Sequence, residues 1–443
     1  MTTSANAAWM SDQTSLGIRT VRKLKIRLLP WLFVRFVVAY IDRINVGFAA
    51  LTMNRELGIS GQQFGTAVGV FFFGYFAFEV PSNLLLHKIG ARIWMARILL
   101  TWGILASATG FVRSLHELYA VRFLLGVAEA GYFPGIVLYL TYWFRKSERS
   151  QAIAIFSTAI PIASIVGGPI SGAILDRIHW LGVSSWRWLL ILEGLPAVLC
   201  GLATYFILPS RPSEAKFLTS EERDWLHDAL AREEQQKLER HRYSVLETMV
   251  SGRVWYLIVI QFGMMIGLYT LLFWTPQLLK SFSALYSNST VGLLVMIPHF
   301  VGLVAMILVA RSSDRLLERR YHAGISALAG GVALVLLGKF HSPVVLAVAL
   351  LSLLAAGIYS FISPFWALPS EFLCGFAAAA GIGLINSFAN LGGFVGPYAV
   401  GTMSSWAGGF YRGIALIGIP LLCSAALLML LPKNPSKNWK DAR

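Results

Sequence analysis

Four charged side chains lie inside two long apolar runs of this chain, where charge is unusual. Asp42 and Arg43 are neighbours in the first run, and Arg122 and Glu129 are seven residues apart in the fourth. An ionised side chain near the middle of a bilayer costs at least about 2.5–3.5 kcal/mol on insertion scales. Such residues normally face a bundle interior or a water-filled path where ions or substrates pass. The chemistry they predict is the binding and transfer of charge across a membrane.

The spacing of these residues indicates separate roles. Arg122 and Glu129 lie on nearly one face of a helix, about 10 Å apart along its axis, and we expect both to face a central cavity. Asp42 and Arg43 point roughly 100° apart, so they cannot serve one partner equally well. Arginine binds a carboxylate through two parallel hydrogen bonds and does not titrate. The alternative is that all four residues only hold the first and fourth helices together through ion pairs. Burying four charges for that purpose alone is energetically costly in lipid.

Composition indicates that most of the chain lies in lipid. Hydrophobic residues make up 56% of it and charged residues 13%, against roughly 25% in soluble domains. A net charge of +15 would suggest nucleic acid in a soluble protein, but the basic residues cluster at the edges of apolar runs, where they orient a membrane protein. The expected partner is therefore the lipid bilayer, and no nucleic acid is expected.

No pattern in the sequence predicts enzyme chemistry. The three cysteines, Cys200, Cys374 and Cys423, lie in apolar stretches without metal-ligand or CxxC spacing. We find no nucleophile, metal cluster or cofactor motif, so we expect no catalytic residue, no metal and no cofactor. The segment before the first run lacks the features of a removable signal peptide, and the first span is expected to serve as an uncleaved anchor.

About twelve runs are long enough to span a bilayer. They are 28–51, 62–86, 92–112, 117–143, 150–175, 187–208, 254–280, 289–311, 322–340, 344–369, 376–403 and 410–431. The predicted fold class is an all-α membrane protein with twelve transmembrane helices in two pseudo-symmetric six-helix bundles. The predicted units are a cytoplasmic N-terminal segment 1–27, bundles 28–208 and 251–431, a cytoplasmic linker 209–250 and a cytoplasmic tail 432–443.

The linker and the loop charges predict how the chain is oriented. Thr219 to Glu222 has capping-box spacing and opens a charged stretch that suits a helix on the membrane surface, although a solvated charged loop fits equally. Lys and Arg gather in one set of loops, whereas the loops on the other side are nearly bare. Both termini and the linker are therefore expected to be cytoplasmic.

The two halves of the chain look like copies of each other. Gly168-Pro169 and Gly396-Pro397 are 228 residues apart, and the same spacing relates Arg92 to Arg320. This is the parallel repeat expected of halves related by an axis along the membrane normal. The spacing carries the four buried charges onto Thr270, Leu271, Leu350 and Gly357, none of which ionises. The titratable groups of the interior therefore belong to the N-terminal half, and neutral contacts are expected in the C-terminal half.

Several motifs resemble the major facilitator superfamily and, within it, the anion:cation symporter family. They are Asp42-Arg43-Ile44-Asn45-Val46, the stretch from Arg122 to Ala130, Gly168-Pro169, and Pro364-Phe365-Trp366-Ala367-Leu368-Pro369. The resemblance implies the major facilitator fold, a small organic anion and a proton as partners, and a monomer. It also implies that Asp42 meets Arg122, that Arg43 presents its guanidinium to a substrate carboxylate, and that Glu129 takes the proton. The expected proton-coupling residues are therefore Asp42, Arg122 and Glu129, all in the N-terminal half.

Further residues are assigned roles by type and position. The predicted substrate contacts, besides Arg43, are Tyr75, Tyr132, Tyr269, Trp274, Trp366, Asn386 and Asn390, and the predicted gating residues are Lys88, Arg92, Asp314 and Arg315. His87 stands where the superfamily's loop usually has an acid, so the cytoplasmic latch is expected to be lopsided. Structural roles are expected for Arg35 (snorkelling), for Arg187, Glu193 and Arg412 (anchoring), for Glu79 and Glu371 (capping or latching near helix ends) and for His299 (core hydrogen bonding).

The function that these patterns favour is proton-coupled uptake of a small organic carboxylate across a bacterial inner membrane. Tartrate, a sugar acid or an aromatic acid would each fit an arginine among aromatic residues. An exchanger or exporter of the same class of anion remains an alternative, because direction follows gradients. A non-transporting membrane sensor is a further alternative, and it would need no titratable acid beside the binding arginine.

Overall fold

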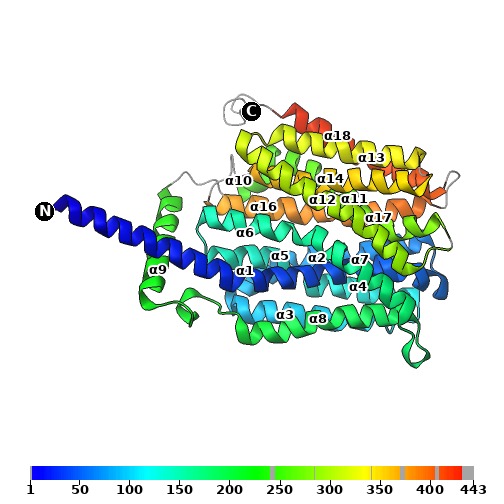
Figure 1. Cartoon of the computed structure of the whole chain (residues 1–443), viewed down its shortest axis with the longest axis horizontal. Helices are drawn as coiled ribbons and strands as arrows, with labels where there is room; N and C mark the ends of the chain where they lie inside the picture. The colour runs from blue at the N-terminus through cyan, green and yellow to red at the C-terminus, as the bar shows by residue number, and fades with distance from the viewer. Residues whose placement is uncertain are drawn as a thin grey trace.

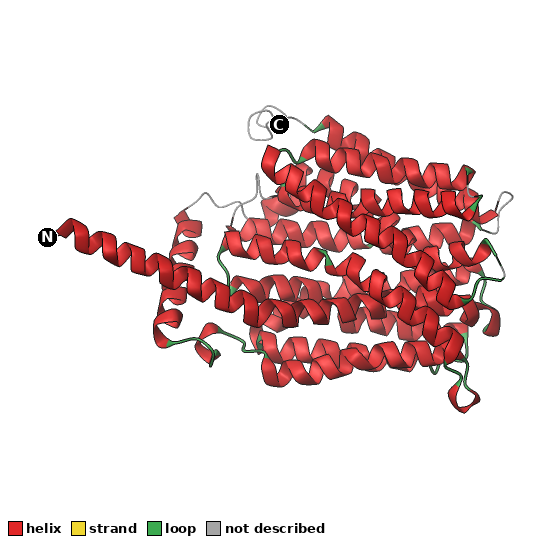
Figure 2. Ribbon diagram, viewed as in Figure 1, coloured by secondary structure: helices red, strands yellow, loops and turns green. Residues whose placement is uncertain are grey.

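The computed structural model describes residues 2–239, 245–283, 285–340, 342–369, 375–404 and 409–431. These residues form helices and connecting loops, with no strand among them (Figure 2), which confirms the all-α fold class. The predicted tail 432–443 and the residues Glu371 and Cys374 lie outside the described ranges. The elements are α1 (Thr2–Glu56), α2 (Gly61–Ile89), α3 (Ala91–Thr109), α4 (Leu115–Glu129), α5 (Tyr132–Thr141), α6 (Lys146–Ser157), α7 (Ala159–Arg177), η1 (Trp180–Gly182), α8 (Ser185–Ile207), η2 (Pro212–Glu214), α9 (Ser220–Glu239), α10 (Val245–Val250), α11 (Gly252–Ser281), α12 (Asn288–Leu316), α13 (Arg320–Lys339), α14 (Val344–Ala367), α16 (Gly375–Asn390), α17 (Gly392–Met403) and α18 (Gly409–Leu430).

Within the described residues, nine helical stretches are long and apolar enough to cross a membrane. The other three expected spans, 28–51, 92–112 and 376–403, lie on α1, α3, and α16 with α17. Three expected spans are broken rather than continuous: 117–143 forms α4 and α5, 150–175 forms α6 and α7, and 376–403 forms α16 and α17. The break after α4 falls at Gly131, whose φ of 80° lies in the left-handed region that side chains with a Cβ disfavour.

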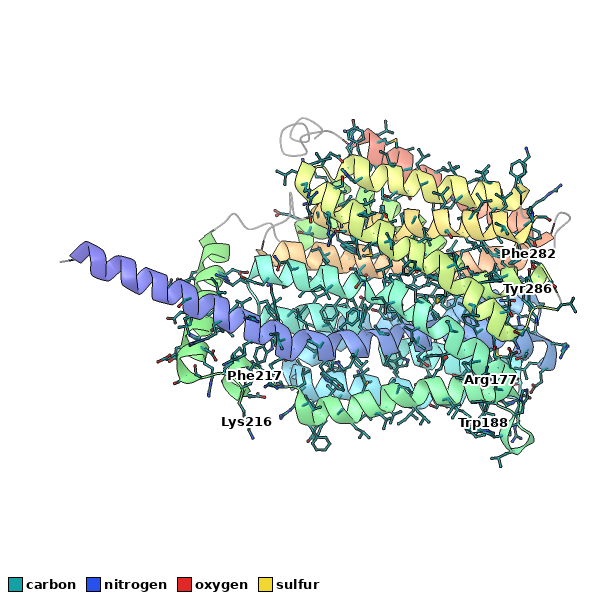
Figure 3. All side chains as sticks on the ribbon, in the orientation of Figure 1. Arg177, Trp188, Lys216, Phe217, Phe282 and Tyr286 are labelled. Atoms are coloured by element: carbon teal, nitrogen blue, oxygen red, sulfur yellow. The ribbon has the colours of Figure 1, made fainter. Side chains whose placement is uncertain are left out.

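The helices run side by side, with α1 to α8 in one half of the bundle and α11 to α18 in the other (Figure 1). The first part of α1 projects beyond the bundle, next to α9. We call this end of the bundle the α9 side and the opposite end the far side. Figure 3 shows Lys216 and Phe217 at the α9 side and Arg177, Phe282 and Tyr286 at the far side.

The linker contains the predicted capped helix. Glu222 N–H donates to Thr219 Oγ1 at 3.3 Å, and Thr219 N–H donates to Glu222 Oε2 at 3.0 Å, which is a complete capping box. The Glu222 carboxylate also accepts hydrogen bonds from Lys23 Nζ at 2.8 and 2.9 Å. This ion pair fixes α9 against the projecting part of α1. Residues 240–244 of the linker lie outside the described ranges.

On the far side the two halves meet through close backbone contacts. A Cβ added to Gly292 of α12 would lie 2.3 Å from the carbonyl oxygen of Gly168 in α7. A Cβ on Gly65 of α2 would lie 2.3 Å from the carbonyl oxygen of Pro397 in α17. The 228-residue spacing carries α2 onto α12, and α7 onto the end of α16 and all of α17, so these two contacts are related by the internal repeat. Only a residue without a side chain permits this approach.

An acidic side chain strengthens the contact between α7 and α12. Asp176 Oδ1 accepts hydrogen bonds from Asn288 N–H at 3.1 Å and from Asn288 Nδ2 at 2.8 Å. Asp176 Oδ2 accepts one from Ser289 N–H at 2.7 Å. A carboxylate from one half therefore satisfies backbone donors in the first turn of a helix from the other half, a favourable place for negative charge.

Gly292→Ala is expected to hold the far side open. Because the new methyl group would overlap a backbone carbonyl, overpacking should destabilise the closed arrangement by about 1–3 kcal/mol. This corresponds to a roughly ten- to hundredfold shift towards states with the far side open. Labelling rates of single cysteines introduced at the far-side ends of α7 and α12 measure the shift. Gly252→Ala is the matched control, since no atom lies within 4 Å of its added Cβ; equal labelling in both variants would contradict this prediction.

Candidate substrate and proton site

Arg43 of α1 and Glu129 of α4 form an ion pair in the interior of the N-terminal half. Arg43 Nη2 contacts Glu129 Oε1, and both side chains are buried. An arginine beside a carboxylate in a water-poor interior gains from mutual attraction, and removal of one partner leaves an uncompensated charge. The structure therefore brings together the two residues to which anion binding and proton transfer were assigned.

Aromatic side chains surround the Arg43 guanidinium. Its central carbon lies 4.9, 5.5 and 5.8 Å from the ring centroids of Tyr40, Phe71 and Tyr75. These distances suit cation–π attraction, which strengthens when the cation is shielded from water. Arg43 Nη1 also donates a long hydrogen bond, 3.4 Å, to the hydroxyl of Tyr269 from the C-terminal half. Arg43 thus contacts both halves of the molecule.

Asp42 points away from this pair, towards α3. Its carboxylate accepts hydrogen bonds from Trp102 Nε1 and, at 3.3 Å, from Asn45 Nδ2. In the part of the chain that the structure describes, Asp42 and Arg122 are near enough to attract each other electrostatically, but they form no direct ion pair. The physical reason is that the α1 rotation placing Arg43 against α4 turns the neighbouring Asp42 towards Trp102.

Arg122 is buried with unsatisfied hydrogen-bond donors. Its Nε and Nη2 atoms have no hydrogen-bond partner among the described residues, and its guanidinium carbon lies 5.2 Å from the centroid of the Phe71 ring. Buried donors without acceptors are costly, so such a group suits an anion that arrives later. The Phe71 ring therefore lies near both guanidinium groups, that of Arg43 and that of Arg122.

The C-terminal half contributes a chain of neutral polar groups. The hydroxyl of Tyr269 on α11 donates to Asn390 Oδ1 at 2.9 Å, and Asn390 Nδ2 donates to the carbonyl of Asn386 at 2.9 Å. Asn386 Nδ2 then donates to Glu79 Oε1 on α2 at 2.9 Å. We call this series, from Glu129 through Arg43 and Tyr269 to Glu79, the central network.

Glu79 was expected to cap or latch near a helix end and was not predicted to belong to the site. The sequence placed it near a helix end, but it is buried ten residues before α2 ends and also accepts a hydrogen bond from Ser387 Oγ. The signal available in the sequence was its spacing: Tyr75 and Glu79 are four residues apart on one face of an apolar helix. An intramembrane acid on such a face is a functional candidate by default.

Three predicted substrate contacts lie outside the central network. Tyr132 packs on Phe36 and Trp102, Trp274 packs on Phe64 and Phe410, and Trp366 packs on Phe365. Tyr132 thus lies on the Asp42 side, through Trp102. Among described residues the structure shows no hydrogen bond, ion pair or ring contact from these three side chains to Arg43, Tyr269 or Glu79.

The predicted gating residues do not meet one another. Asp314 forms an ion pair at 2.5 Å with Arg319 of its own half. Arg92 lies 6.0 Å from the Tyr205 ring centroid of α8, and Lys88 and Arg315 are exposed. No described contact links Lys88 or Arg92 to Asp314 or Arg315, so this conformation has no charged latch across the halves at these residues. The side chain of His87 lies outside the description.

Other buried polar residues have structural partners. Arg35, expected to snorkel, is instead fully buried and donates to Thr204 Oγ1 at 3.0 Å. Glu193, expected to anchor a helix end, is buried and accepts a hydrogen bond from Ser171 at 2.7 Å. His299 Nδ1 lies 2.7 Å from the Tyr359 hydroxyl, as expected of a hydrogen-bonded core residue. Within the described ranges no cluster of His, Cys, Asp and Glu could hold a metal ion.

Comparison with known proteins places this arrangement among transporters. A model of the Major Facilitator Superfamily matches residues 32–397. An Agrobacterium vitis protein named "Putative tartrate transporter" is 42% identical over 425 residues, 96% of this chain and 97% of its own. An Acinetobacter baumannii protein named "Quinolone resistance transporter" is 38% identical over 411 residues, 93% of this chain and 94% of its own.

A solved structure shares the fold. The partially occluded inward-open conformation of the xylose transporter XylE from E. coli superposes with a TM-score of 0.72. The superposition covers 92% of this chain and 98% of XylE, at 14% sequence identity. At this identity the likeness shows the fold and carries no inference about substrate.

Proposed function

Because this chain belongs to the Major Facilitator Superfamily and is a multi-pass membrane transporter, we propose that it takes up a small organic carboxylate together with protons. Tartrate, a sugar acid or an aromatic acid would each fit this class. The Agrobacterium relative named for tartrate supports an organic acid as substrate. The central network supplies the chemistry that such a substrate needs.

The ion pair between Arg43 and Glu129 is the observation that carries this proposal. An arginine can bind a carboxylate through two parallel hydrogen bonds. A carboxylate of the protein itself, that of Glu129, already contacts Arg43. A substrate carboxylate must therefore replace Glu129 at the guanidinium. Two carboxylates cannot share this site while both are ionised, because their like charges repel where no water screens them.

A proton on Glu129 resolves this competition. The neutral acid no longer holds Arg43 as an ion pair, so the guanidinium becomes available to the substrate carboxylate. The positive charge stays compensated throughout, which a low-dielectric interior favours. Substrate and proton then enter the occluded state together, and neither is bound well without the other.

The contacts of Arg43 also connect binding to movement of the two halves. A substrate held by Arg43 would lie beside Tyr269 and Asn390, which belong to the C-terminal half. Alternating access in this superfamily's repeat architecture moves one half against the other around a central site. The close contacts on the far side must separate for the site to open there.

Uptake by the purified protein in proteoliposomes with an imposed pH gradient tests the proposal. Tartrate, gluconate and 4-hydroxybenzoate are the probes, each added outside acid-exterior vesicles. Accumulation of at least one acid above its external concentration, abolished by a proton uncoupler, is the expected result. Failure of all three to accumulate, while fold and orientation are intact, would refute it.

An exchanger or exporter of organic anions is the second candidate. The relative named "Quinolone resistance transporter" matches nearly the whole chain at 38% identity, and its name does not mention an organic acid. Counterflow of labelled acid into vesicles preloaded with unlabelled acid, without any pH gradient, separates the two. Equal rates with and without the gradient would favour the exchanger.

We also propose that the protein is a monomer in the bacterial inner membrane with both termini cytoplasmic. The basic residues before the first span and around the linker support this orientation. Labelling of single cysteines on the far side with a membrane-impermeant reagent tests it in whole cells. Labelling on α9 instead of on the far side would reverse the orientation.

Acidification is expected to tighten apparent substrate affinity. Substrate binds the form in which Glu129 carries a proton, so the fraction able to bind rises as pH falls. Each substrate should also bring at least as many protons as its own charge, so transport should be electroneutral or carry net positive charge inward. Electrode recordings on membranes containing the protein measure both effects. An inward negative current without pH dependence would contradict the prediction.

A further inference from the structure

The central network has two levels, one helical turn apart. Tyr75 and Glu79 are four residues apart on α2, and Asn390 and Asn386 are four residues apart on α16. Four residues advance a helix by about 6 Å. At the first level Tyr75 and Asn390 belong to the surroundings of Arg43, directly and through Tyr269. At the second level Asn386 meets Glu79.

The second level consists of one acid, Glu79, and two neutral hydrogen-bond partners. Glu79 Oε1 accepts from Asn386 Nδ2, and Glu79 Oε2 accepts from Ser387 Oγ. No cation forms an ion pair with Glu79 among the described residues. Each carboxylate oxygen can accept a further hydrogen bond. Glu79 can therefore accept further hydrogen bonds, and when it is ionised no cation among the described residues pairs with it.

Tyr75, at the first level, has a hydroxyl without a hydrogen-bond partner among the described residues. Its ring centroid is 5.8 Å from the Arg43 guanidinium carbon, and its side chain is 4% exposed. The structure shows no hydrogen bond to this hydroxyl from any residue it describes. This hydroxyl is therefore free to form a hydrogen bond with a ligand. Tyr75 thus indicates that polar ligand groups belong between Arg43 and Glu79.

On the basis of the proposed function, we propose that Glu79 is a specificity-determining residue. It acts on the end of the substrate opposite the carboxylate that Arg43 binds. With one carboxylate on Arg43, the rest of the substrate extends towards Glu79, Asn386 and Ser387. Hydroxyl groups at that end donate hydrogen bonds to Glu79 and accept them from the amide and hydroxyl of its neighbours. A second carboxylate at that end meets Glu79 as a like charge. The site therefore selects hydroxylated monocarboxylates and rejects dicarboxylates.

The preference for one acid over another follows from charge repulsion and unpaired hydrogen-bonding groups rather than from the shape of the site. Like charges placed together in a buried interface discriminate strongly between partners. A site built to hydrogen-bond hydroxyl groups likewise penalises a ligand that leaves those groups unpaired. We expect at least a tenfold preference for the monocarboxylate over the matched dicarboxylate. This preference would exclude tartrate as the best substrate of this chain.

Two matched pairs of acids test the inference on the full-length purified protein. Gluconate and glucarate differ only at one end, where a hydroxymethyl group replaces a carboxylate. 4-Hydroxybenzoate and terephthalate form the corresponding aromatic pair. Dissociation constants are measured at neutral pH in detergent and again by competition for uptake in proteoliposomes. In the wild type, the monocarboxylate of whichever pair binds should bind at least tenfold tighter than its dicarboxylate.

The Glu79→Gln variant should reduce this preference to threefold or less, mainly because the dicarboxylate binds better. Glu193→Gln removes a buried carboxylate outside the central network and is the matched control, for which the preference should stay unchanged. Because the wild-type ratio tests the inference without any variant, a Glu79→Gln protein that misfolds does not remove the test.

The outcomes separate this inference from the proposed function. A wild-type ratio near one, a preference for the dicarboxylate, or an unchanged ratio in Glu79→Gln would overturn the inference and leave carboxylate transport standing. If no acid of either pair binds or is taken up, the role of Glu79 and the proposed function both fail.

Discussion

Arg43→Lys is expected to weaken substrate binding about ten- to hundredfold, although the variant keeps the positive charge. The planar guanidinium makes two parallel hydrogen bonds to a carboxylate, whereas an ammonium is a point charge that cannot reproduce them. A hydrogen bond to a charged group contributes about 1.5–3 kcal/mol, which corresponds to this loss in affinity. Lysine would also reach Glu129 and Tyr269 less well from the same position on α1.

Equilibrium binding of the transported acid to the purified variant measures the effect. Arg35→Lys is the matched control, because Arg35 lies on the same helix, is buried and contacts Thr204 rather than the central network. This control should lower thermal stability and leave affinity unchanged. An affinity of Arg43→Lys within a few-fold of wild type would remove Arg43 from the substrate site.

Glu129→Gln should abolish uphill uptake and preserve exchange of substrate between loaded compartments. A glutamine mimics the protonated acid, so Arg43 is permanently released for the substrate carboxylate. The accumulation ratio under a pH gradient should fall at least tenfold, to a value near one. Substrate affinity should meanwhile stay high at alkaline pH and lose its dependence on pH, because the competing charge is absent.

Paired measurements of pH-driven uptake and counterflow in proteoliposomes test this prediction. Glu193→Gln again serves as the control, since this carboxylate is held by Ser171 outside the central network. If Glu129→Gln still concentrates substrate, the proton travels on another acid. Asp42, with its contacts to Trp102 and Asn45, and Glu79 would then be the next candidates.

The sequence predicted features that depend on residues within one segment of the chain. The apolar runs predicted where helices lie, because a bilayer imposes a minimum length on each span. The capping box at Thr219 was predicted correctly, since it depends on residues three apart. The four buried charges were visible because charge inside an apolar run is costly. Breaks in the middle of a run, as at Gly131, were missed, since a lone glycine inside an apolar pattern does not end a helix by itself.

Which side chains meet across helices was decided only by the tertiary structure. The sequence alone determined that Arg43 and Glu129 are buried charges on helices, and helical periodicity determined which neighbours share a face. The pairing of Arg43 with Glu129, and of Asp42 with Trp102, depends on how α1 is rotated against α3 and α4. The burial of Glu79 against Asn386 depends on residues more than 300 positions away. Rotation and approach of helices follow from packing summed over whole interfaces, and no local pattern encodes that sum.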